Sequence, residues 1–487
     1  MDEKLSRTAA AILVIISLIA LYLIRVANGV SAVARIALAL AMLVGVGIVV
    51  QRLLKLKGGY GLYMIGGKRG ISSIDNTARK HNAFWDAMSM WGLTLGFGIL
   101  TYPLMKGKID KRVYVFGLVS LFLITIFILP NLGSAMQFIN LPQIQNALAG
   151  NPTTSLSLGG LSVLGYIIDA ITVFTGFSGL LFALLFISTE SILWGVVQFT
   201  FAPSQAAATG ITNQLGVAPI IPGIDVPFLA GIGALIILLT IHEFSHGVLA
   251  RKAKVKLQSI GVLVFGSVPI GGFVEPDEKM VEKLDNVKQT KIFSAGIAAN
   301  FIAMVVFFVL MSAMIVYVLP SVFQYRVVVA SVLPNYPANG VLKSGMQIIK
   351  WNNYTILGNI NNLTLASAHT MPNSTVTVVA NTSTYSFKAV PSRSNSSKGI
   401  IGVSLGTKYL PIKPSLYSSF VYFLYTLFAL SMLLNFFVAA INLLPIPGFD
   451  GWRIYYANIK KEKFIKFMAA LVIILIIVNI LPVFFYL

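Results

Sequence analysis

Long apolar runs recur along the whole chain and determine the architecture we expect. A helix of about 20 residues crosses the hydrocarbon core of a bilayer, and most of these runs reach about that length. The run at 161–197 is long enough for one strongly tilted helix or for two crossings. We therefore expect a polytopic α-helical membrane protein with about 8–10 spans. The runs are Thr8–Val26, Ala34–Val50, Phe84–Leu104, Val113–Pro130, Leu161–Val197, Phe228–Ala250, Phe293–Pro320, Tyr417–Leu444 and Phe464–Leu487.

Between residues 324 and 408 the pattern changes to short apolar stretches separated by Asn, Ser, Gly and Pro. Stretches of this length predict strands, and so a small β-rich domain inserted into the membrane protein. The chain then divides into an N-terminal transmembrane region of unknown role (1–200), a first membrane core (225–322), the inserted domain (324–408) and a second membrane core (416–487). The predicted strands are Arg326–Leu333, Thr375–Ala380, Tyr385–Val390 and Gly399–Leu405.

The inserted domain also has an unusual polar composition. No Asp or Glu lies between Gln324 and Lys413, which suits an acidic exterior, where carboxylates lose their charge. Asn-X-Ser/Thr sequons cluster in this domain and mark it as a candidate for glycosylation outside the cytoplasm. The candidate acceptors are Asn353, Asn362, Asn373, Asn381 and Asn395.

The composition excludes an ordinary soluble protein. Charged residues make up 11% of the 487 residues, whereas soluble domains contain about 25%. The net charge of +20 is typical of Lys and Arg in the cytoplasmic loops of a membrane protein, and we expect no nucleic-acid partner. Two basic segments, Arg251–Lys256 and Lys460–Lys466, are therefore expected on the cytoplasmic side. The chain has no Cys, which excludes disulfides and thiolate metal sites.

Two histidines four residues apart form the centre of the candidate chemistry. His242 and His246 share one face of the apolar run 228–250, so their imidazoles can bind one Zn²⁺ ion. Glu243 lies beside them, where it can take a proton from an attacking water. Ionisable groups inside an apolar span are costly, which favours a functional site. His246 precedes Arg251 by five residues, so the metal is expected about 10 Å below the cytoplasmic surface.

The third ligand is expected at the end of a later span. Pro445, Pro447 and Gly448 break the helix before Asp450, which lets its carboxylate turn into the bundle. After His246 the chain crosses outward once and returns once, so Asp450 lies on the same membrane side as the histidines. The inserted domain then falls on the opposite, extracytoplasmic side, in a multi-pass protein that we place in the cell membrane.

At these residues the chain resembles the site-2 protease family of intramembrane zinc metalloproteases. Residues 242–246 match its H-E-x-x-H motif, and residues 442–451 match N-x-x-P-x-P-x-x-D-G, with Phe449 where Leu is usual. The resemblance implies hydrolysis of peptide bonds within or near transmembrane segments of membrane-protein substrates, as in regulated intramembrane proteolysis. It also implies one zinc ion per chain, held by His242, His246 and Asp450, with Glu243 as the general base.

Two weaker segments extend the resemblance over residues 225–280 and 290–487. Gly266–Asp277 is similar to the family's Gly-rich segment after the first motif, and Ser294–Asn300 to its A-G-P-x-x-N element, with Ile297 in place of Pro. By this resemblance, three residues position substrate or support the backbone, although polar contacts between packed helices explain them equally well. They are Asn300, Asn442 and Gly451.

Part of the inserted domain, Val332–Asn352, resembles a PDZ domain, although Met346 follows Gly345 where the family has Asp. PDZ domains bind extended peptides and terminal carboxylates. Besides the membrane-protein substrate and the lipid bilayer, a peptide or a trimmed substrate end is therefore an expected partner. A structural plug without peptide affinity is the competing interpretation.

Two other functions fit parts of the sequence. A zinc transporter or metal-gated pore would also place His and Asp inside the membrane, and the Pro-Gly break before Asp450 suits that reading. An inactive membrane scaffold would use the PDZ-like domain alone. A metalloendopeptidase is favoured because His242, Glu243, His246 and Asp450 are all present.

Overall fold

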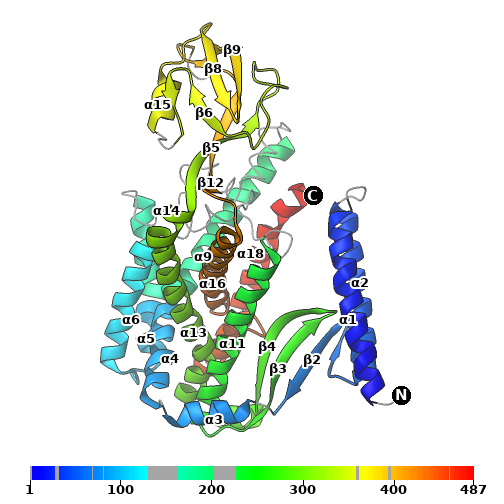
Figure 1. Cartoon of the computed structure of the whole chain (residues 1–487). Helices are drawn as coiled ribbons and strands as arrows, with labels where there is room; N and C mark the ends of the chain where they lie inside the picture. Colours follow the sequence, from blue (N-terminus) through cyan, green and yellow to red (C-terminus); the bar gives the residue numbers. More distant parts are fainter. Residues whose placement is uncertain are drawn as a thin grey trace. The chain divides into compact units, whose positions relative to one another are not determined.

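The structure is a computed structural model of the chain, and it forms two compact units. Unit 1 comprises Met1–Leu310 and Thr426–Leu487, and unit 2 comprises Met311–Tyr425. Figure 1 shows the elements of both units, and each unit is described here by itself. The described residues are 3–27, 32–68, 70–80, 82–129, 163–201, 226–357, 361–392, 396–459 and 461–486.

Within these described ranges, eight helices are long and apolar enough to cross a membrane. This confirms the expected polytopic helical class. The spans are formed by α1 (Glu3–Val26), α2 (Ala32–Leu54), α6 (Lys111–Leu123) with the π-helical turn η2 (Ile124–Ile128), α9 (Val163–Phe201), α11 (Phe228–Lys252), α13 (Asn286–Ala313) with η3 (Met314–Val318) and α14 (Leu319–Val322), α16 (Leu416–Ile441) and α18 (Glu462–Tyr486).

The run expected at 84–104 is broken into α4 (Asn82–Phe97), the 3₁₀ turn η1 (Gly98–Leu100) and α5 (Thr101–Leu104), and it is not among the candidate spans. The break occurs where η1 meets α9. A Cβ on Gly98, whose φ is +54°, would lie 2.3 Å from the carbonyl oxygen of Val173. On the facing helix, Gly176 leaves helical geometry with φ +67°, and its Cβ would lie 2.3 Å from the Gly96 carbonyl. Two glycines thus allow this backbone contact, and α9 consists of two helical segments on either side of a kink at Gly176.

A four-stranded antiparallel sheet joins the N-terminal region to the helix that carries the histidines. Its strand order is β1 (Gly58–Gly59), β2 (Leu62–Gly67), β3 (Leu257–Phe265) and β4 (Val268–Pro276). The Gly-rich segment Gly266–Asp277 therefore forms the turn and the second strand of the β3–β4 hairpin. The buried Tyr63 of β2 donates a 2.8 Å hydrogen bond from its hydroxyl to the Gly266 carbonyl in that hairpin.

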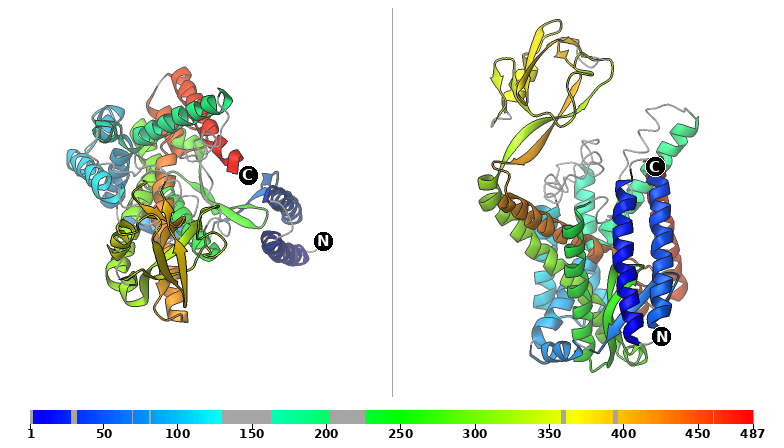
Figure 2. Two further views of the ribbon diagram at one scale, coloured as in Figure 1. Left: turned by 90° about the horizontal axis from the view of Figure 1, so that it is seen from above. Right: turned by 45° about the vertical axis from the view of Figure 1, so that its right-hand side comes forward.

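The helical pair α1 and α2 contacts this sheet, as both Figure 1 and Figure 2 show. Buried residues of the pair and the sheet form one apolar cluster, in which Tyr63 packs with Ala10, Val46, Val50 and Val264. Burial of such a cluster stabilises the attachment.

Ion pairs hold the N-terminal helices to the core of unit 1. Arg251 of α11 bonds Asp75 on α3 (Ile71–Lys80), and Lys252 of α11 pairs with Asp86 on α4. Lys291 of α13 approaches the other oxygen of Asp86 at 3.2 Å. Asp86 thus links three helices.

Unit 2 contains the expected β-rich insertion. A long antiparallel ribbon of β5 (Phe323–Val332) and β12 (Val403–Pro411) connects it to the helices of the unit. Its main sheet has the order β7 (Tyr354–Thr355), β6 (Ile348–Trp351), β8 (Thr375–Ala380) and β9 (Ser383–Lys388). The short helix α15 (Asn361–Ala368) and the strand pair β10 (Val390–Pro391) and β11 (Gly399–Ile400) complete it. The core includes Trp351, Val376, Val378, Phe387 and Ile401.

The sequons occupy turns and a helix of this unit. Asn353, Asn373 and Asn381 are exposed, and the Asn381 side-chain oxygen accepts a 2.9 Å hydrogen bond from the Gln347 backbone. The Asn362 side-chain nitrogen, to which a glycan would attach, donates to the Thr355 carbonyl at 2.8 Å. Asn395 lies outside the described residues. Glycosylation at these positions stays a prediction.

Candidate metal centre

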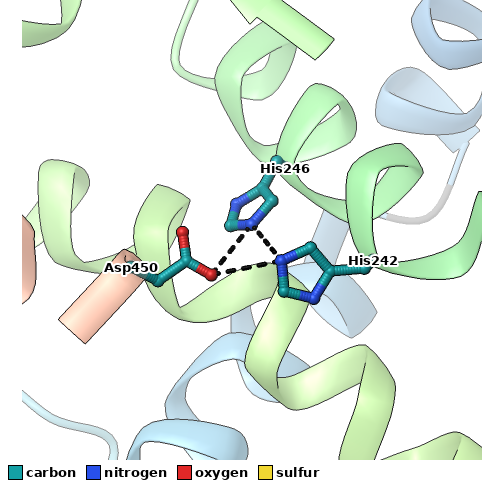
Figure 3. Close-up of side chains that lie close together, drawn as sticks. All are labelled: His242, His246 and Asp450. Carbon is teal, nitrogen blue, oxygen red and sulfur yellow. Dashed lines mark hydrogen bonds and ion pairs between the residues drawn. The ribbon is translucent and has the colours of Figure 1, made fainter. Parts of the chain in front are cut away.

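Two turns of α11 present the histidines to the interior of unit 1. His242 is buried, with 7% of its surface exposed, and His246 is partly buried one turn later. Because they are four residues apart, both imidazoles point the same way, as Figure 3 shows. Their Nε2 atoms are 3.1 Å apart.

A tight loop brings Asp450 to these nitrogens. α16 ends at Ile441, and the chain turns through the prolines to restart as α17 (Asp450–Asn458). The Gly451 N–H donates to the Asn442 carbonyl at 2.6 Å, which closes the loop. A Cβ on Gly451 would lie 2.5 Å from the Leu443 carbonyl, so this closure requires glycine. Asn442 and Gly451 therefore act here through their backbones.

The three ligand atoms form a nearly equilateral triangle. Oδ2 of Asp450 lies 3.2 Å from Nε2 of His242 and 3.2 Å from Nε2 of His246. Zinc bonds of 2.0–2.1 Å at tetrahedral angles place ligand atoms about 3.3 Å apart, so the triangle fits one tetrahedral ion with a free fourth position. Oδ2 is buried, and apart from the two imidazoles it has no hydrogen-bond donor among the described residues. Its lone pairs therefore remain available to a cation.

The charge of Asp450 also suits a metal ligand. Burial alone would raise the pKa of its carboxyl group, but the imidazoles of His246 and His242 lower this pKa well below its usual value. Asp450 is consequently ionised at neutral pH. A carboxylate with two imidazoles is a common donor set for catalytic zinc.

Helix α13 also contacts both imidazoles. Nδ1 of His246 lies 2.8 Å from the Ile292 carbonyl, and Nδ1 of His242 lies 3.0 Å from the Asn300 side-chain amide. Between these residues, a Cβ on Gly296 would lie 2.4 Å from Nε2 of His246 and 2.6 Å from Nε2 of His242. The missing side chain keeps open the space beside the two nitrogens that a bound ion needs.

Glu243 is held by the sheet. Its Oε2 accepts a 3.0 Å hydrogen bond from the backbone N–H of Val274 in β4. Its Cγ packs against Gly272, where a Cβ would approach to 3.1 Å. Glu243 therefore has a fixed position on the helix that carries both histidines, one residue after His242.

The structure thus brings together most residues singled out in the sequence. His242, His246 and Asp450 meet in one triangle, and Asn300 contacts His242. Sequence reasoning missed Gly296 and Val274. The small residues around Gly296 could have indicated a close helix contact, but nothing local identifies its partner. The role of Val274 can be found only from the fold, which places β4 beside Glu243.

Comparison with known proteins agrees with this geometry. Residues 230–463 match the model of peptidase family M50. The uncharacterized protein MJ0971 of Methanocaldococcus jannaschii is 26% identical over 249 residues, which are 50% of this chain and 61% of that relative. The chain thus spans less than two thirds of the relative's length. The matched segment contains both histidines, Glu243, Asn300 and Asp450. Residues 230–463 are therefore similar to the peptidase core of family M50, the site-2 protease family.

Proposed function

We propose that this protein is an intramembrane zinc metalloprotease that cleaves peptide bonds within or near the transmembrane segments of membrane proteins. The observation that carries the proposal is the triangle of His242, His246 and Asp450. The two histidines and Glu243 lie on α11, a helix long enough to span a membrane, and Asp450 reaches them from α17. A peptidase family match over the same residues supports hydrolysis rather than transport.

Each residue of the centre has a distinct task in this proposal. His242, His246 and Asp450 hold the ion, and Zn²⁺ when bound supplies Lewis-acid polarisation of the scissile carbonyl. Glu243 accepts a proton from the attacking water and returns it to the leaving amine. The Val274 N–H keeps the Glu243 carboxylate in place during this transfer. Gly296 leaves room beside both nitrogens.

The substrate follows from the setting of the site. A peptide bond inside a helix is shielded by its own hydrogen bonds, so a transmembrane substrate must unwind before hydrolysis. We propose that the site faces the cytoplasmic half of the membrane, next to Arg251 and Lys252. The β-rich insertion would lie outside the cytoplasm and bind extended or trimmed ends of substrates as a PDZ-like domain does.

Zinc content and cleavage by the purified full chain test this function. Wild type should carry about one zinc per chain, and Asp450→Ala should carry much less. Glu243→Gln should retain zinc but not cleave a panel of single-span substrates with different helix-breaking residues in liposomes. Cleavage by Glu243→Gln would exclude this base. Zinc flux into liposomes without cleavage would favour the transporter, and wild type without zinc would favour the scaffold.

A further inference from the structure

One face of α13 packs along the two histidines of α11. Ile292, Gly296 and Asn300 are spaced by four residues, so they lie on the same face over three successive turns. The first contacts His246, the last contacts His242, and the middle one has no side chain where both imidazoles approach. The outer two residues of this face therefore contact the Nδ1 atoms of the imidazoles, and Gly296 lies beside the Nε2 atoms that face Asp450.

The contacts at Nδ1 determine which nitrogen can bind a metal. A neutral imidazole carries one hydrogen, and a metal on Nε2 requires that hydrogen on Nδ1. For His246 the acceptor is the Ile292 carbonyl, which can only accept, so Nδ1 carries the hydrogen and Nε2 is free. His242 lacks such a backbone acceptor among the contacts of the described residues. Its Nδ1 lies 3.0 Å from Nδ2 of the Asn300 amide, whose buried Oδ1 has no hydrogen-bond partner among the described residues.

An amide can serve this role in one of its two orientations. The oxygen and nitrogen of an Asn side chain exchange places on a half turn about the last bond, and their assignment follows from the hydrogen-bond network. With Oδ1 toward His242, the amide accepts from Nδ1–H and leaves Nε2 free for an ion. Asn300 is fully buried, and an amide buried in a span is costly unless it is hydrogen-bonded.

We propose that Asn300 is a positioning residue of the metal centre, whose amide oxygen accepts the Nδ1 hydrogen of His242 and so directs Nε2 toward Asp450. This rests on the proposed zinc function and adds a residue that acts through a ligand. Hydrogen-bonded partners of this kind orient metal-binding histidines and raise their basicity. Gly296 makes the arrangement possible because it lets α13 approach α11 closely enough for the 3.0 Å contact.

The test compares zinc affinity in purified full-length variants, measured by competition with a chelator. Asn300→Leu removes the acceptor but keeps a side chain that branches at Cγ, and we expect affinity to fall about 10- to 100-fold. Asn300→Asp restores an acceptor, so its affinity should stay within about threefold of wild type. Asn435→Leu is the matched control, because Asn435 is equally buried and its amide bonds the Ser431 carbonyl of its own helix. Its zinc affinity should not change.

A second measurement covers the case in which Asn300→Leu does not fold. Nitrogen-15 NMR of labelled histidines in zinc-loaded wild type should show the His242 hydrogen on Nδ1. A hydrogen on Nε2, or unchanged affinity in folded Asn300→Leu, would overturn the positioning role. If wild type binds zinc and the leucine variant binds it equally well, only this inference fails. If wild type binds no zinc, the proposed function fails with it.

Discussion

The backbone N–H of Val274 donates a 3.0 Å hydrogen bond to Oε2 of Glu243. β4 is the last strand of its sheet, and its outer edge has no partner strand among the described residues. A hydrogen bond to an ionised carboxylate is stronger than one between neutral groups, and more so away from water. The strand edge therefore orients the proposed general base.

This contact predicts that Val274→Pro impairs cleavage without removing the metal. Proline deletes the N–H but is tolerated on the outer edge of a sheet. We expect kcat to fall about tenfold or more, since a positioned base contributes about 10²–10⁴. Zinc per chain should stay at the wild-type level. Val274→Ala keeps the N–H and is the control, and equal kcat values for the two variants would disprove the role of the hydrogen bond.

The close packing at Gly296 leads to a second prediction, about the affinity of the site for zinc. A Cβ at this position would lie 2.4 Å from Nε2 of His246, so Gly296→Ala must displace the imidazole or push α13 away. We expect zinc affinity to fall at least about tenfold, as when a ligand's supporting contact is lost. Gly45→Ala on α2 is the control, because a Cβ there meets nothing within 4 Å. Wild-type zinc binding by folded Gly296→Ala would contradict this reading.

The site was largely predictable because its ligands lie in local motifs, whereas their supports lie far along the chain. The spacing of His242 and His246 follows from helix geometry alone, and the prolines before Asp450 predict the turn that brings it inward. The β-rich insertion was predictable from its short apolar stretches. In contrast, the pairing of β2 with β3 joins segments that are far apart in sequence, and no local pattern encodes that partnership.

Apolar length alone also did not predict that one expected span is broken into shorter helices. The run at 84–104 has enough apolar residues to cross a membrane, yet it breaks at Gly98 where the chain touches α9. That close approach depends on Gly176, more than seventy residues later. Glycine in a sequence indicates where a chain can bend, but the facing backbone decides where it does.

Asp86 is predicted to stabilise the junction of the N-terminal helices with the core. It pairs with Lys252 and Lys291 from two different helices. Asp86→Asn should lower the free energy of unfolding by about 1 kcal/mol, because these pairs are only partly shielded from water. The loss should shrink at high salt, which screens exposed charges. Thermal unfolding in detergent measures it, with Glu462→Gln as the control.

Glu462 suits this comparison because its ion pair with Lys466 lies within one helix, and its hydrogen bond with Tyr456 reaches only the neighbouring α17, so its loss leaves the N-terminal junction intact. Its variant should unfold closer to wild type than Asp86→Asn does. Equal midpoints for the two variants would mean that Asp86 does not hold the junction together.

The absence of carboxylates between Gln324 and Lys413 predicts how the β-rich insertion responds to acid. Acid unfolding arises mostly because carboxylates paired in the native state must take up protons. With none in this segment, acidification breaks no carboxylate ion pair there. Its free energy of unfolding should therefore stay nearly constant from about pH 5 to pH 2.5, within the range where carboxyl groups titrate.

Hydrogen exchange on the full chain, corrected for the intrinsic pH dependence, checks this prediction. Peptides from β8 and β9 should keep their protection over this range. α4 provides the internal control. Burial raises the pKa of Asp86 there, but its pairs with Lys252 and Lys291 outweigh burial and lower this pKa, so their contribution to stability is lost in acid. The protection of α4 should fall as the pH drops. If β8 and β9 lose protection together with α4, the insertion is not adapted to acid, and its composition would need another explanation.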